Sequence, residues 1–304
     1  MNGIIIINKP KNYTSFDVIA VMRKLLRTKK LGHTGTLDPM ATGVLPILIG
    51  RATKLQSLIP DNNKEYIASF RLGVTTDTLD ITGKIISSSP SNVSKLQLQS
   101  VLNNFRGNIK QVPPMFSAVQ KDGIRLYSLA QKGIEIERDA RNVTIYQLDL
   151  ICFDEISQEG KILVECSKGT YIRTLCDDIG QLLGCGAVLT DLQRTKACSF
   201  DIDNSITLDE ARVLSEQNHL DEYILPCDAI LKRYNQTFIS NLQSTRFKNG
   251  GALSLNRIPC PSSVRNDELI RVYDCEKNFL GLGRANKAKH ELSVACLIDL
   301  PKNM

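Results

Sequence analysis

Asp38 stands in a local sequence that suits nucleophilic chemistry. It lies within a glycine-rich run, residues 31–46, and precedes Pro39, which favours an extended backbone at the residue before it. The Asp38 side chain is therefore expected to project from a loop. Only two acids, Asp17 and Asp38, occur among residues 1–54, against nine Lys and Arg, so we expect this carboxylate to stay ionised, as a nucleophile must. Alternatively, Asp38 only caps a turn before Pro39, as most Asp-Pro pairs do.

The charge along the chain is unevenly distributed. The net charge is +7 over residues 1–54, −7 over residues 55–231 and +6 over residues 232–304. Two basic ends around an acidic middle suggest a protein that grips a polyanion at two places. Ordinary solvated surface charge accounts for the same figures equally well. The basic run at residues 23–30 leads directly into the loop that carries Asp38.

The elements expected to position this loop combine strands and helices. A buried strand is predicted over residues 3–8. Thr14, followed three residues later by Asp17, indicates a capping box, and the apolar spacing beyond it predicts a helix to about residue 27. Residues 29–50 mix glycines and prolines with apolar residues and have little helical or strand periodicity. We predict that they form a structured loop.

The following residues add further strands and helices to this first unit. They predict strands over residues 65–72, 141–153 and 161–166, and helices over residues 94–105 and 171–183. Because the strands and helices do not alternate strictly, the pattern favours an α+β fold, with a mixed, mostly antiparallel sheet core, over a doubly wound one.

The pattern changes near residue 231. Beyond it, short β-rich segments are separated by Gly, Asn and Pro, as is typical of a small all-β module. We therefore predict two domains, residues 1–230 and residues 231–304. The β-rich segments of the second cover residues 253–258, 269–273, 279–284 and 292–298.

The sequence carries no motif for a metal or a cofactor. None of the nine cysteines is paired at C-x-x-C spacing, and the three histidines lie far apart in the sequence. A Walker-type glycine loop and a dinucleotide fingerprint are both missing, so we expect no cofactor. The longest aliphatic run near the start, residues 4–7, is too short for a membrane span or a signal-peptide core. A cytoplasmic protein is therefore expected.

The run at residues 32–46 closely resembles the signature loop of the TruB family of pseudouridine synthases. The resemblance implies the pseudouridine synthase fold for the first domain. Residues 279–283, with the basic excess around them, resemble the small PUA-like, RNA-binding barrel of bacterial members. Further blocks that match the TruB family follow one another in the family's order, at residues 8–15, 64–83, 112–118, 166–175 and 186–195.

The resemblance assigns three residues to catalysis. The aspartate that matches Asp38 is the family's nucleophile, which either labilises the glycosidic bond or adds to the uracil ring; the order of these steps stays open. Tyr66 matches a tyrosine that stacks on the target base and is implicated in removing the C5 proton. Arg173 matches an arginine that pairs with the aspartate and keeps it charged. All atoms of the base are retained in this isomerisation, so the family needs no cofactor or metal.

The resemblance also assigns residues to the substrate. His33 matches a histidine that takes the space vacated by the flipped nucleotide, and Tyr171 and Leu192 match positions that line the uracil pocket. Asp80 matches an acid that supports the pocket. Taken alone, Tyr66 would be interpreted as a half-buried tyrosine of a strand, and Tyr171 and Leu192 as core residues. Arg173 would be interpreted as a helix surface charge, and His33 as a histidine hydrogen-bonded within a glycine loop.

The substrate implied is tRNA, with isomerisation of the T-loop uridine at position 55 after base flipping. Two alternatives remain: a synthase acting on another RNA, for example under a guide RNA, and a catalytically silent chaperone of tRNA folding. Guide-dependent relatives usually carry extra terminal segments and basic tails. Since this sequence has no such tail, we expect a monomer that acts without an obligate protein partner and without a membrane.

Three residues depart from the family pattern. Asn12 replaces a usual glycine, but Asn tolerates left-handed backbone angles, so the turn is expected to survive. Gln193 replaces a common arginine, and Cys198 stands near a usual glycine, which is expected to weaken RNA contacts or shift packing. None of the three touches the expected catalytic residues.

Overall fold

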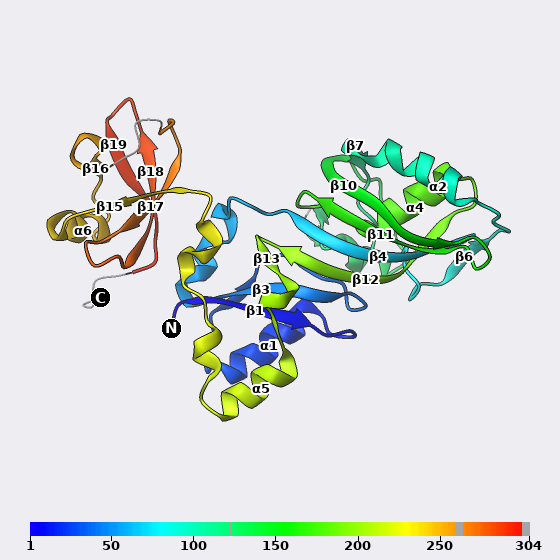
Figure 1. Cartoon of the computed structure of the whole chain (residues 1–304), viewed down its shortest axis with the longest axis horizontal. Helices are drawn as coiled ribbons and strands as arrows, with labels where there is room; N and C mark the ends of the chain where they lie inside the picture. Colours follow the sequence, from blue (N-terminus) through cyan, green and yellow to red (C-terminus); the bar gives the residue numbers. More distant parts are fainter. Residues whose placement is uncertain (122, 260–263, 300–304) are drawn as a thin grey trace.

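The structure is a computed structural model, and it describes residues 1–121, 123–259 and 264–299. Figure 1 shows an elongated molecule with a five-stranded C-terminal sheet at one end of its long axis. A ten-stranded sheet fills the rest of the length, and helices α2 (Lys95–Leu102) and α4 (Ile172–Leu182) lie near the far end. Two short hairpins, β5 (Val74–Thr76) with β6 (Ile85–Ser88) and β8 (Gln120–Lys121) with β9 (Ile124–Arg125), stand apart from both sheets.

The large sheet is mixed and mostly antiparallel. Its main path runs in the order β14-β1-β3-β12-β4-β11-β10-β7, with β2 paired to β3 and β13 paired to β12. Only β1 with β14 and β12 with β3 run parallel among its pairs in the described residues. The α+β prediction is therefore confirmed. Its strands are β1 (Gly3–Lys9), β2 (Leu31–His33), β3 (Thr42–Ile49), β4 (Lys64–Leu72), β7 (Gly107–Gln111), β10 (Arg141–Asp154), β11 (Glu159–Cys166), β12 (Ala187–Ala197), β13 (Phe200–Asp201) and β14 (Ile206–Thr207).

Helices cover the large sheet in two groups. Helices α1 (Ser15–Leu25) and α5 (Leu208–Glu216) pack together beside β1, whereas α4 packs on β12 and α2 on β10. The predicted capping box starts α1: the Asp17 amide donates to Thr14 Oγ1 at 3.0 Å, and the Thr14 amide donates to Asp17 Oδ2 at 2.8 Å. The remaining helical segments are short: α3 (Leu126–Ala130), η1 (Gly50–Leu58), η2 (Asn103–Phe105), η3 (Ile202–Asn204), η4 (Leu220–Tyr223) and η5 (Cys227–Leu231).

The prediction of a loop over residues 29–50 is wrong, because this segment contains β2 and β3. Strand β3 pairs with β1 from Gly43 opposite Lys9 to Ile49 opposite Gly3. Nearly every residue of β3 is buried, so its sequence lacks the apolar–polar alternation of a half-exposed strand. A proline is unusual within a strand because it has no amide hydrogen to donate. The carbonyl of Pro46 nevertheless accepts the Thr34 amide at 3.2 Å.

The C-terminal module is built on a five-stranded sheet in the order β15-β17-β18-β19-β16. It is not all-β, because α6 (Asn241–Lys248) follows β15. Only Ser244 and Phe247 of this short helix are buried, which is too little to produce a visible helical period. The strands are β15 (Asn235–Phe238), β16 (Leu253–Ser254), β17 (Leu269–Tyr273), β18 (Phe279–Asn286) and β19 (Glu291–Leu297), with η6 (Leu255–Arg257) after β16.

One apolar cluster joins the two sheets. Leu269 and Leu282 of the C-terminal sheet are buried in the same cluster as Ile4 and Val44 of the large sheet. Arg51 adds a polar link by donating from Nη2 to the Leu297 carbonyl at 3.0 Å. The chain passes from one sheet to the other between β14 and β15, and we keep residue 231 as the proposed start of the second domain.

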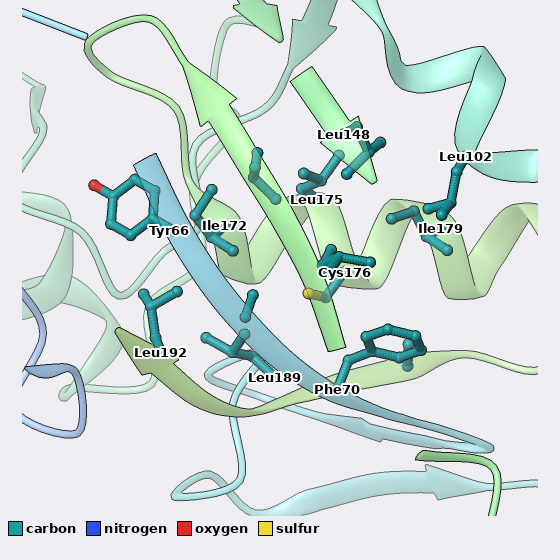
Figure 2. Close-up of a cluster of buried hydrophobic side chains, with 14 of the residues drawn as sticks. Tyr66, Phe70, Leu102, Leu148, Ile172, Leu175, Cys176, Ile179, Leu189 and Leu192 are labelled. Atoms are coloured by element: carbon teal, nitrogen blue, oxygen red, sulfur yellow. The ribbon is translucent and has the colours of Figure 1, made fainter. Parts of the chain in front are cut away.

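A second cluster fixes helix α4 to the large sheet. Ile172, Leu175, Cys176 and Ile179 follow the helical period and are all buried against strands β4, β11 and β12 (Figure 2). Each fully buried aliphatic side chain of this kind contributes about 1.5–3 kcal/mol. The helix that carries Arg173 is thus rigidly held.

Among the described residues, every helix is too short or too polar to pass through a lipid bilayer.

Candidate active site

The Asp38 loop connects β2 to β3, and the first residue of helix α1 holds its backbone. The Leu37 amide donates to Ser15 Oγ at 2.8 Å, and the Ser15 hydroxyl donates back to the Leu37 carbonyl at 3.2 Å. Both residues are buried. The residue immediately before Asp38 is therefore fixed in two directions by one side chain.

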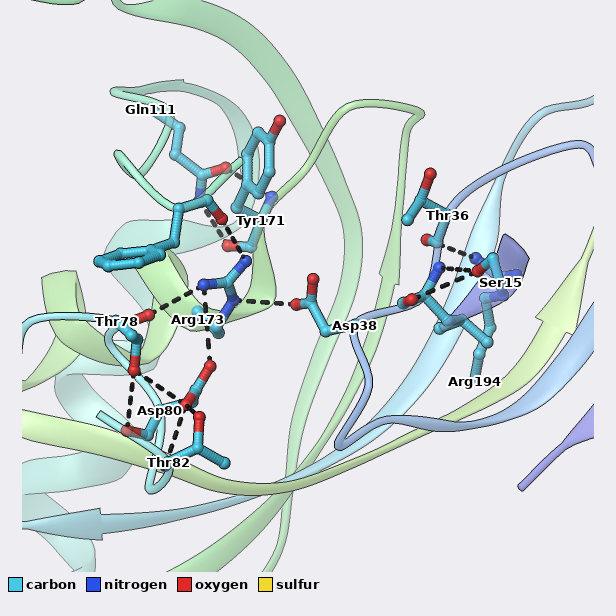
Figure 3. Close-up of polar contacts among 12 residues, drawn as sticks. Ser15, Thr36, Asp38, Thr78, Asp80, Thr82, Gln111, Tyr171, Arg173 and Arg194 are labelled. Atoms are coloured by element: carbon cyan, nitrogen blue, oxygen red, sulfur yellow. Dashed lines mark hydrogen bonds and ion pairs between the residues drawn. The ribbon is translucent and has the colours of Figure 1, made fainter. Parts of the chain in front are cut away.

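Arg194 also holds the Asp38 loop, through hydrogen bonds to its backbone. This β12 residue has no exposed surface, and its guanidinium donates to three backbone carbonyls: Val44 at 2.7 Å, Gly35 at 3.1 Å and Thr36 at 3.4 Å. Figure 3 shows Ser15 and Arg194 together on one side of Asp38. A buried cation without an acidic partner is costly unless its N–H groups are satisfied, and here carbonyl oxygens satisfy them.

Lys9, at the end of β1, is a second buried cation beneath the loop. Its Nζ donates to the Tyr13 carbonyl at 2.6 Å and to the Pro39 carbonyl at 3.3 Å. Burial lowers the pKa of Lys9 to about 8, although the nearby Asp38 carboxylate partly opposes this shift. The turn before α1 also reaches the loop, since the Asn12 amide donates to the Pro39 carbonyl at 2.8 Å. Asn12 has φ of 67°, the left-handed angle expected for it.

Asp38 forms an ion pair with Arg173. Nε of Arg173 lies 2.9 Å from Oδ2 of Asp38, in the geometry of a charge-assisted hydrogen bond (Figure 3). The Arg173 side chain is 5% exposed and the Asp38 side chain 36% exposed. The carboxylate is therefore stabilised as an anion while it stays accessible from the pocket.

Arg173 is itself held on three further sides. Its Nη1 donates to the Thr78 carbonyl and its Nη2 to the Phe116 carbonyl, each at 2.9 Å. Asp80 completes the set, with Oδ2 3.7 Å from Nη1. The Asp80 carboxylate is in turn fixed by the Thr82 amide, which donates to its Oδ1 at 3.0 Å. The series of charged groups Asp38, Arg173 and Asp80 is therefore held in place at its Asp80 end (Figure 3).

Tyr66, on β4, forms part of the pocket wall. Its side chain belongs to the apolar cluster under α4, with the hydroxyl pointing away from that cluster (Figure 2). Burial raises the pKa of Tyr66 to about 12, and the positive charge of Arg194 opposes the shift only in part. At neutral pH this residue is a neutral phenol.

These side chains meet in one pocket of about 290 Å³. Asp38, Tyr66, Tyr171, Arg173 and Leu192, five of the residues expected at the site, line it together. An anionic oxygen, a fixed guanidinium and an aromatic wall can receive a planar polar ring and attack it.

Gln111 fixes the backbone at Tyr171, the residue before α4. Its side-chain Nε2 donates to the Tyr171 carbonyl at 3.0 Å, and the Tyr171 amide donates to Gln111 Oε1 at 2.7 Å. Both bonds are visible in Figure 3. This reciprocal pair sets where the Tyr171 side chain enters the pocket.

Comparison with known proteins identifies the chain. Residues 23–172 match the model of the TruB family pseudouridylate synthase N-terminal domain, and residues 173–232 match that of the tRNA pseudouridylate synthase B C-terminal domain. A relative named tRNA pseudouridine synthase B from Clostridium tetani is 44% identical, over 94% of this chain and 96% of its own. This chain belongs to the TruB family. A relative of the same name from Clostridioides difficile is 40% identical, over 97% of this TruB-family chain and 98% of its own.

Solved structures support the fold of this TruB-family protein. A chain in a structure described as an H/ACA RNP bound to a substrate RNA containing 2'-deoxyuridine has a TM-score of 0.75 and 22% identity, covering 99% of this chain and 86% of its own. A chain from a Cbf5-Nop10-Gar1 complex has a TM-score of 0.73 and 25% identity, covering 99% and 84%. The two-sheet architecture is thus shared with these proteins.

His33 and Asp80 are the two expected site residues that do not line the pocket. Asp80 lies beside Arg173, with its Oδ2 3.7 Å from Nη1. His33 is half-buried on β2 opposite Ile47, with its Nδ1 buried and no hydrogen-bond partner for that atom in the described residues. Burial lowers the pKa of His33, and the Arg194 charge lowers it further, so the ring is neutral at neutral pH.

Four residues of the TruB-family site were given no role from the sequence: Lys9, Ser15, Gln111 and Arg194. Lys9 and Arg194 lie within matching blocks of the sequence, so the signal was present, but two isolated cations are normally interpreted as surface residues. Gln111 lies one residue before such a block. Ser15 lies at the end of the matching block of residues 8–15, next to the Thr14 cap of the helix.

Proposed function

We propose that this protein isomerises the T-loop uridine at position 55 of tRNA to pseudouridine, with Asp38 as the nucleophile. Membership of the TruB family and the name tRNA pseudouridine synthase B of its relatives support the reaction and the substrate class. The observation that carries the assignment of the nucleophile is the 2.9 Å ion pair of Asp38 with the buried Arg173, at the wall of the pocket that Tyr66 also lines.

The proposed reaction exchanges one bond to the ribose for another. The target uridine leaves the RNA stack and enters the pocket, at a cost of a few kcal/mol that contacts with the protein must offset. The Asp38 carboxylate attacks either the sugar or the uracil ring, and the O–C bond that it forms breaks again before release of the product, which restores the carboxylate. The N1–C1' bond breaks, the base rotates, a C5–C1' bond forms, the C5 proton leaves and N1 gains a proton. All other atoms are retained, so the balance needs no oxidant and no co-reactant.

Arg173 and Asp80 would keep Asp38 in the reactive state. A guanidinium that donates to two carbonyls and lies between two carboxylates has its charge fixed in direction, and the attack needs no reorganisation of this charge. Removing the Arg173 charge would leave the Asp38 carboxylate without its paired cation and without the contact that fixes its position.

Tyr66 would act first through its ring. An aromatic face stacks on an extruded pyrimidine, and the residue enters the reaction as a neutral phenol because its pKa is about 12. The phenol oxygen can accept the C5 proton only through a lone pair. The hydroxyl proton of Tyr66 must therefore leave for another acceptor at the same time. This concerted relay differs from proton removal by a preformed phenolate.

The RNA would be bound mainly through its phosphates. The basic run at residues 23–30 ends directly before β2, the strand that leads into the Asp38 loop, and its Lys and Arg side chains would contact phosphates of the bound RNA. Such contacts give salt-sensitive affinity, while the pocket selects the base. A folded T-loop, with its bases splayed out, suits this division of roles. We further propose that the protein acts in the cytoplasm as a monomer.

A transcript of the T-arm, incubated with the purified protein alone, tests the proposal. We expect pseudouridine at position 55 with wild type and none with Asp38→Asn, mapped chemically at each uridine. Asp191→Asn is the matched control, because Asp191 is half-exposed on β12 and, among the described residues, pairs only with Lys11.

Three results would separate the alternatives. Wild type that binds the transcript but forms no pseudouridine would favour a silent folding chaperone. Product only after a guide RNA or a partner protein is added would favour another RNA as substrate. Full activity of Asp38→Asn would leave the reaction in place and remove the proposed nucleophile.

A further inference from the structure

A second cavity, of about 520 Å³, lies behind the segments that hold Arg173. It shares no lining residue with the catalytic pocket. Leu79 and Phe116 form part of its wall. The two carbonyls that accept the Arg173 N–H groups belong to Phe116 and to Thr78, the residue before Leu79. Whatever occupies this cavity therefore touches the support of the catalytic pair from the opposite side.

The wall of the cavity is largely apolar and partly exposed to solvent. Ile86, Ile134 and Val112 line it, with exposed fractions of 69%, 46% and 44%. Met115 and Phe116 continue this surface inward. Large apolar side chains that face solvent around a concave surface are typical of a binding site for a small molecule.

Helix α4 supplies three polar residues to the cavity. Thr174 is 5% exposed, and its buried hydroxyl has no hydrogen-bond partner among the described residues. The next turn of the helix brings Asp177 and Asp178 to the same cavity. Gln181 Nε2 donates to Asp177 at 3.4 Å, whereas no hydrogen bond or ion pair to the described residues reaches the Asp178 carboxylate. An unpartnered hydroxyl and an unpartnered carboxylate, both facing one cavity, call for a donor.

Charges on the other walls leave these acids unneutralised. Arg138 is the cation of the described lining, but its Nη2 pairs with Glu135 at 3.0 Å. Asp77 adds a further acid, whose Oδ1 accepts the Lys84 amide. Burial raises the pKa of Asp178 to about 6, with the neighbouring Asp177 as the second cause, and burial also raises the pKa of Asp177. Both shifts indicate carboxylates that lack a positive partner.

We propose that this cavity binds a small organic cation. Its ammonium group would donate to Asp177, Asp178 and the Thr174 hydroxyl, and its compact apolar body would lie against Met115 and Phe116. An uncharged ligand of the same shape would leave the carboxylates unpaired, and a bare metal ion would leave the apolar wall in water.

The proposal is tested by binding of 2-phenylethylammonium to the full chain without RNA, measured by isothermal titration at about pH 7.5. We expect saturable binding, about tenfold weaker or more with Asp177→Asn/Asp178→Asn, since the paired charges supply the main polar contacts. Uncharged 2-phenylethanol should not saturate. Asp203→Asn, an exposed acid on η3, is the matched control and should bind as wild type does.

Two further measurements guard against a variant that fails to fold. Thr174→Val keeps the shape of the side chain and should weaken binding severalfold. With wild type, binding should weaken from about pH 7.5 to about pH 5, because protonation of Asp178 removes its charge. Equal binding by the double Asp variant, equal binding of the alcohol, or failure of wild type to saturate at millimolar probe would each overturn the proposal. None of these results depends on the activity toward RNA.

Discussion

Arg173 and Asp38 lie 2.9 Å apart between Nε and Oδ2, and their side chains are 5% and 36% exposed. The arginine is clamped by the carbonyls of Thr78 and Phe116, whereas the second carboxylate oxygen of Asp38 accepts no hydrogen bond from the described residues. The pair thus has one fixed member and one member with a free oxygen. This asymmetry is what a nucleophile needs, since the charge is stabilised while one lone pair stays available.

Arg173→Lys is expected to lower the rate constant for pseudouridine formation by about 100-fold or more. Lysine keeps the charge but has no planar fork to reach the Asp38 carboxylate and both carbonyls at once. Single-turnover assays on the T-arm transcript measure this effect. Arg71→Lys, an exposed position on β4, is the control and should retain the wild-type rate. A wild-type rate in Arg173→Lys would mean that the geometry of the guanidinium is unimportant.

Asp80→Asn is expected to reduce kcat by about tenfold with little change in KM. Its Oδ2 lies 3.7 Å from Nη1 of Arg173, a looser contact than the 2.9 Å pair with Asp38, so the loss should be smaller than for Arg173→Lys. Steady-state kinetics separate the two constants. Asp77→Asn, three residues earlier and outside the ion-pair chain, provides the comparison. A change confined to KM would instead place Asp80 in substrate binding.

Local sequence patterns predicted the elements that begin with a recognisable capping motif or have a clear apolar period. The Thr14–Asp17 capping box gave the start of α1, and the fold class followed from the order of strands and helices. Strand β3 was missed because it is buried on both faces, and Pro46 interrupts its sequence. Helix α6 was missed because only two of its residues face the core. A period can be read only where one face is polar and the element is long enough.

The candidate site could be assembled only partly from the sequence. The resemblance supplied Asp38, Tyr66 and Arg173, which the fold brings to one pocket. Lys9 and Arg194 were not predicted as buried supports, because buried cations are rare and their acceptors come from distant segments. The Arg194 acceptor Gly35, for example, lies 159 residues away in the sequence. Such contacts become apparent only once β3 and β12 are known to be neighbours.

Tyr66→Phe is expected to preserve RNA binding and abolish most turnover, because the ring is kept and the proton relay is lost.

Ionisation of the Tyr66 phenol is also expected to change the stability of the protein at high pH. Burial raises the pKa of Tyr66 from 10.0 to about 12, so its stabilising contribution is complete below about pH 10. Between pH 10 and about 12 the unfolded state ionises first, and the free energy of unfolding falls as pH rises, by up to about 3 kcal/mol.

Urea unfolding of wild type and Tyr66→Phe at about pH 9 and about pH 11 measures this difference. Wild type should lose more stability over this range than the phenylalanine variant, since only wild type carries the ionisable buried phenol. Equal losses would show that the Tyr66 hydroxyl is not shielded from water.

Gly43→Ala is expected to destabilise the protein by about 2–4 kcal/mol and to lower activity. Gly43 has φ of +105°, and a Cβ there would clash with the Arg194 backbone carbonyl, where β3 runs beside β12. Two costs therefore add: the strained backbone angle and the displacement of the strand that carries Arg194. Moving this strand also moves the guanidinium away from the carbonyls of the Asp38 loop.

Gly184→Ala isolates the first of these two costs. Gly184 has φ of +77° with no atom near the position of a Cβ, so substitution there adds backbone strain without a clash. Its expected loss is about 1 kcal/mol, with activity unchanged. Urea unfolding and the T-arm assay on both variants provide the comparison. If Gly43→Ala costs no more than Gly184→Ala, close packing of β3 on β12 does not position Arg194. If Gly43→Ala is destabilised but keeps full activity, the Arg194 contacts support the fold without setting the geometry of the Asp38 loop.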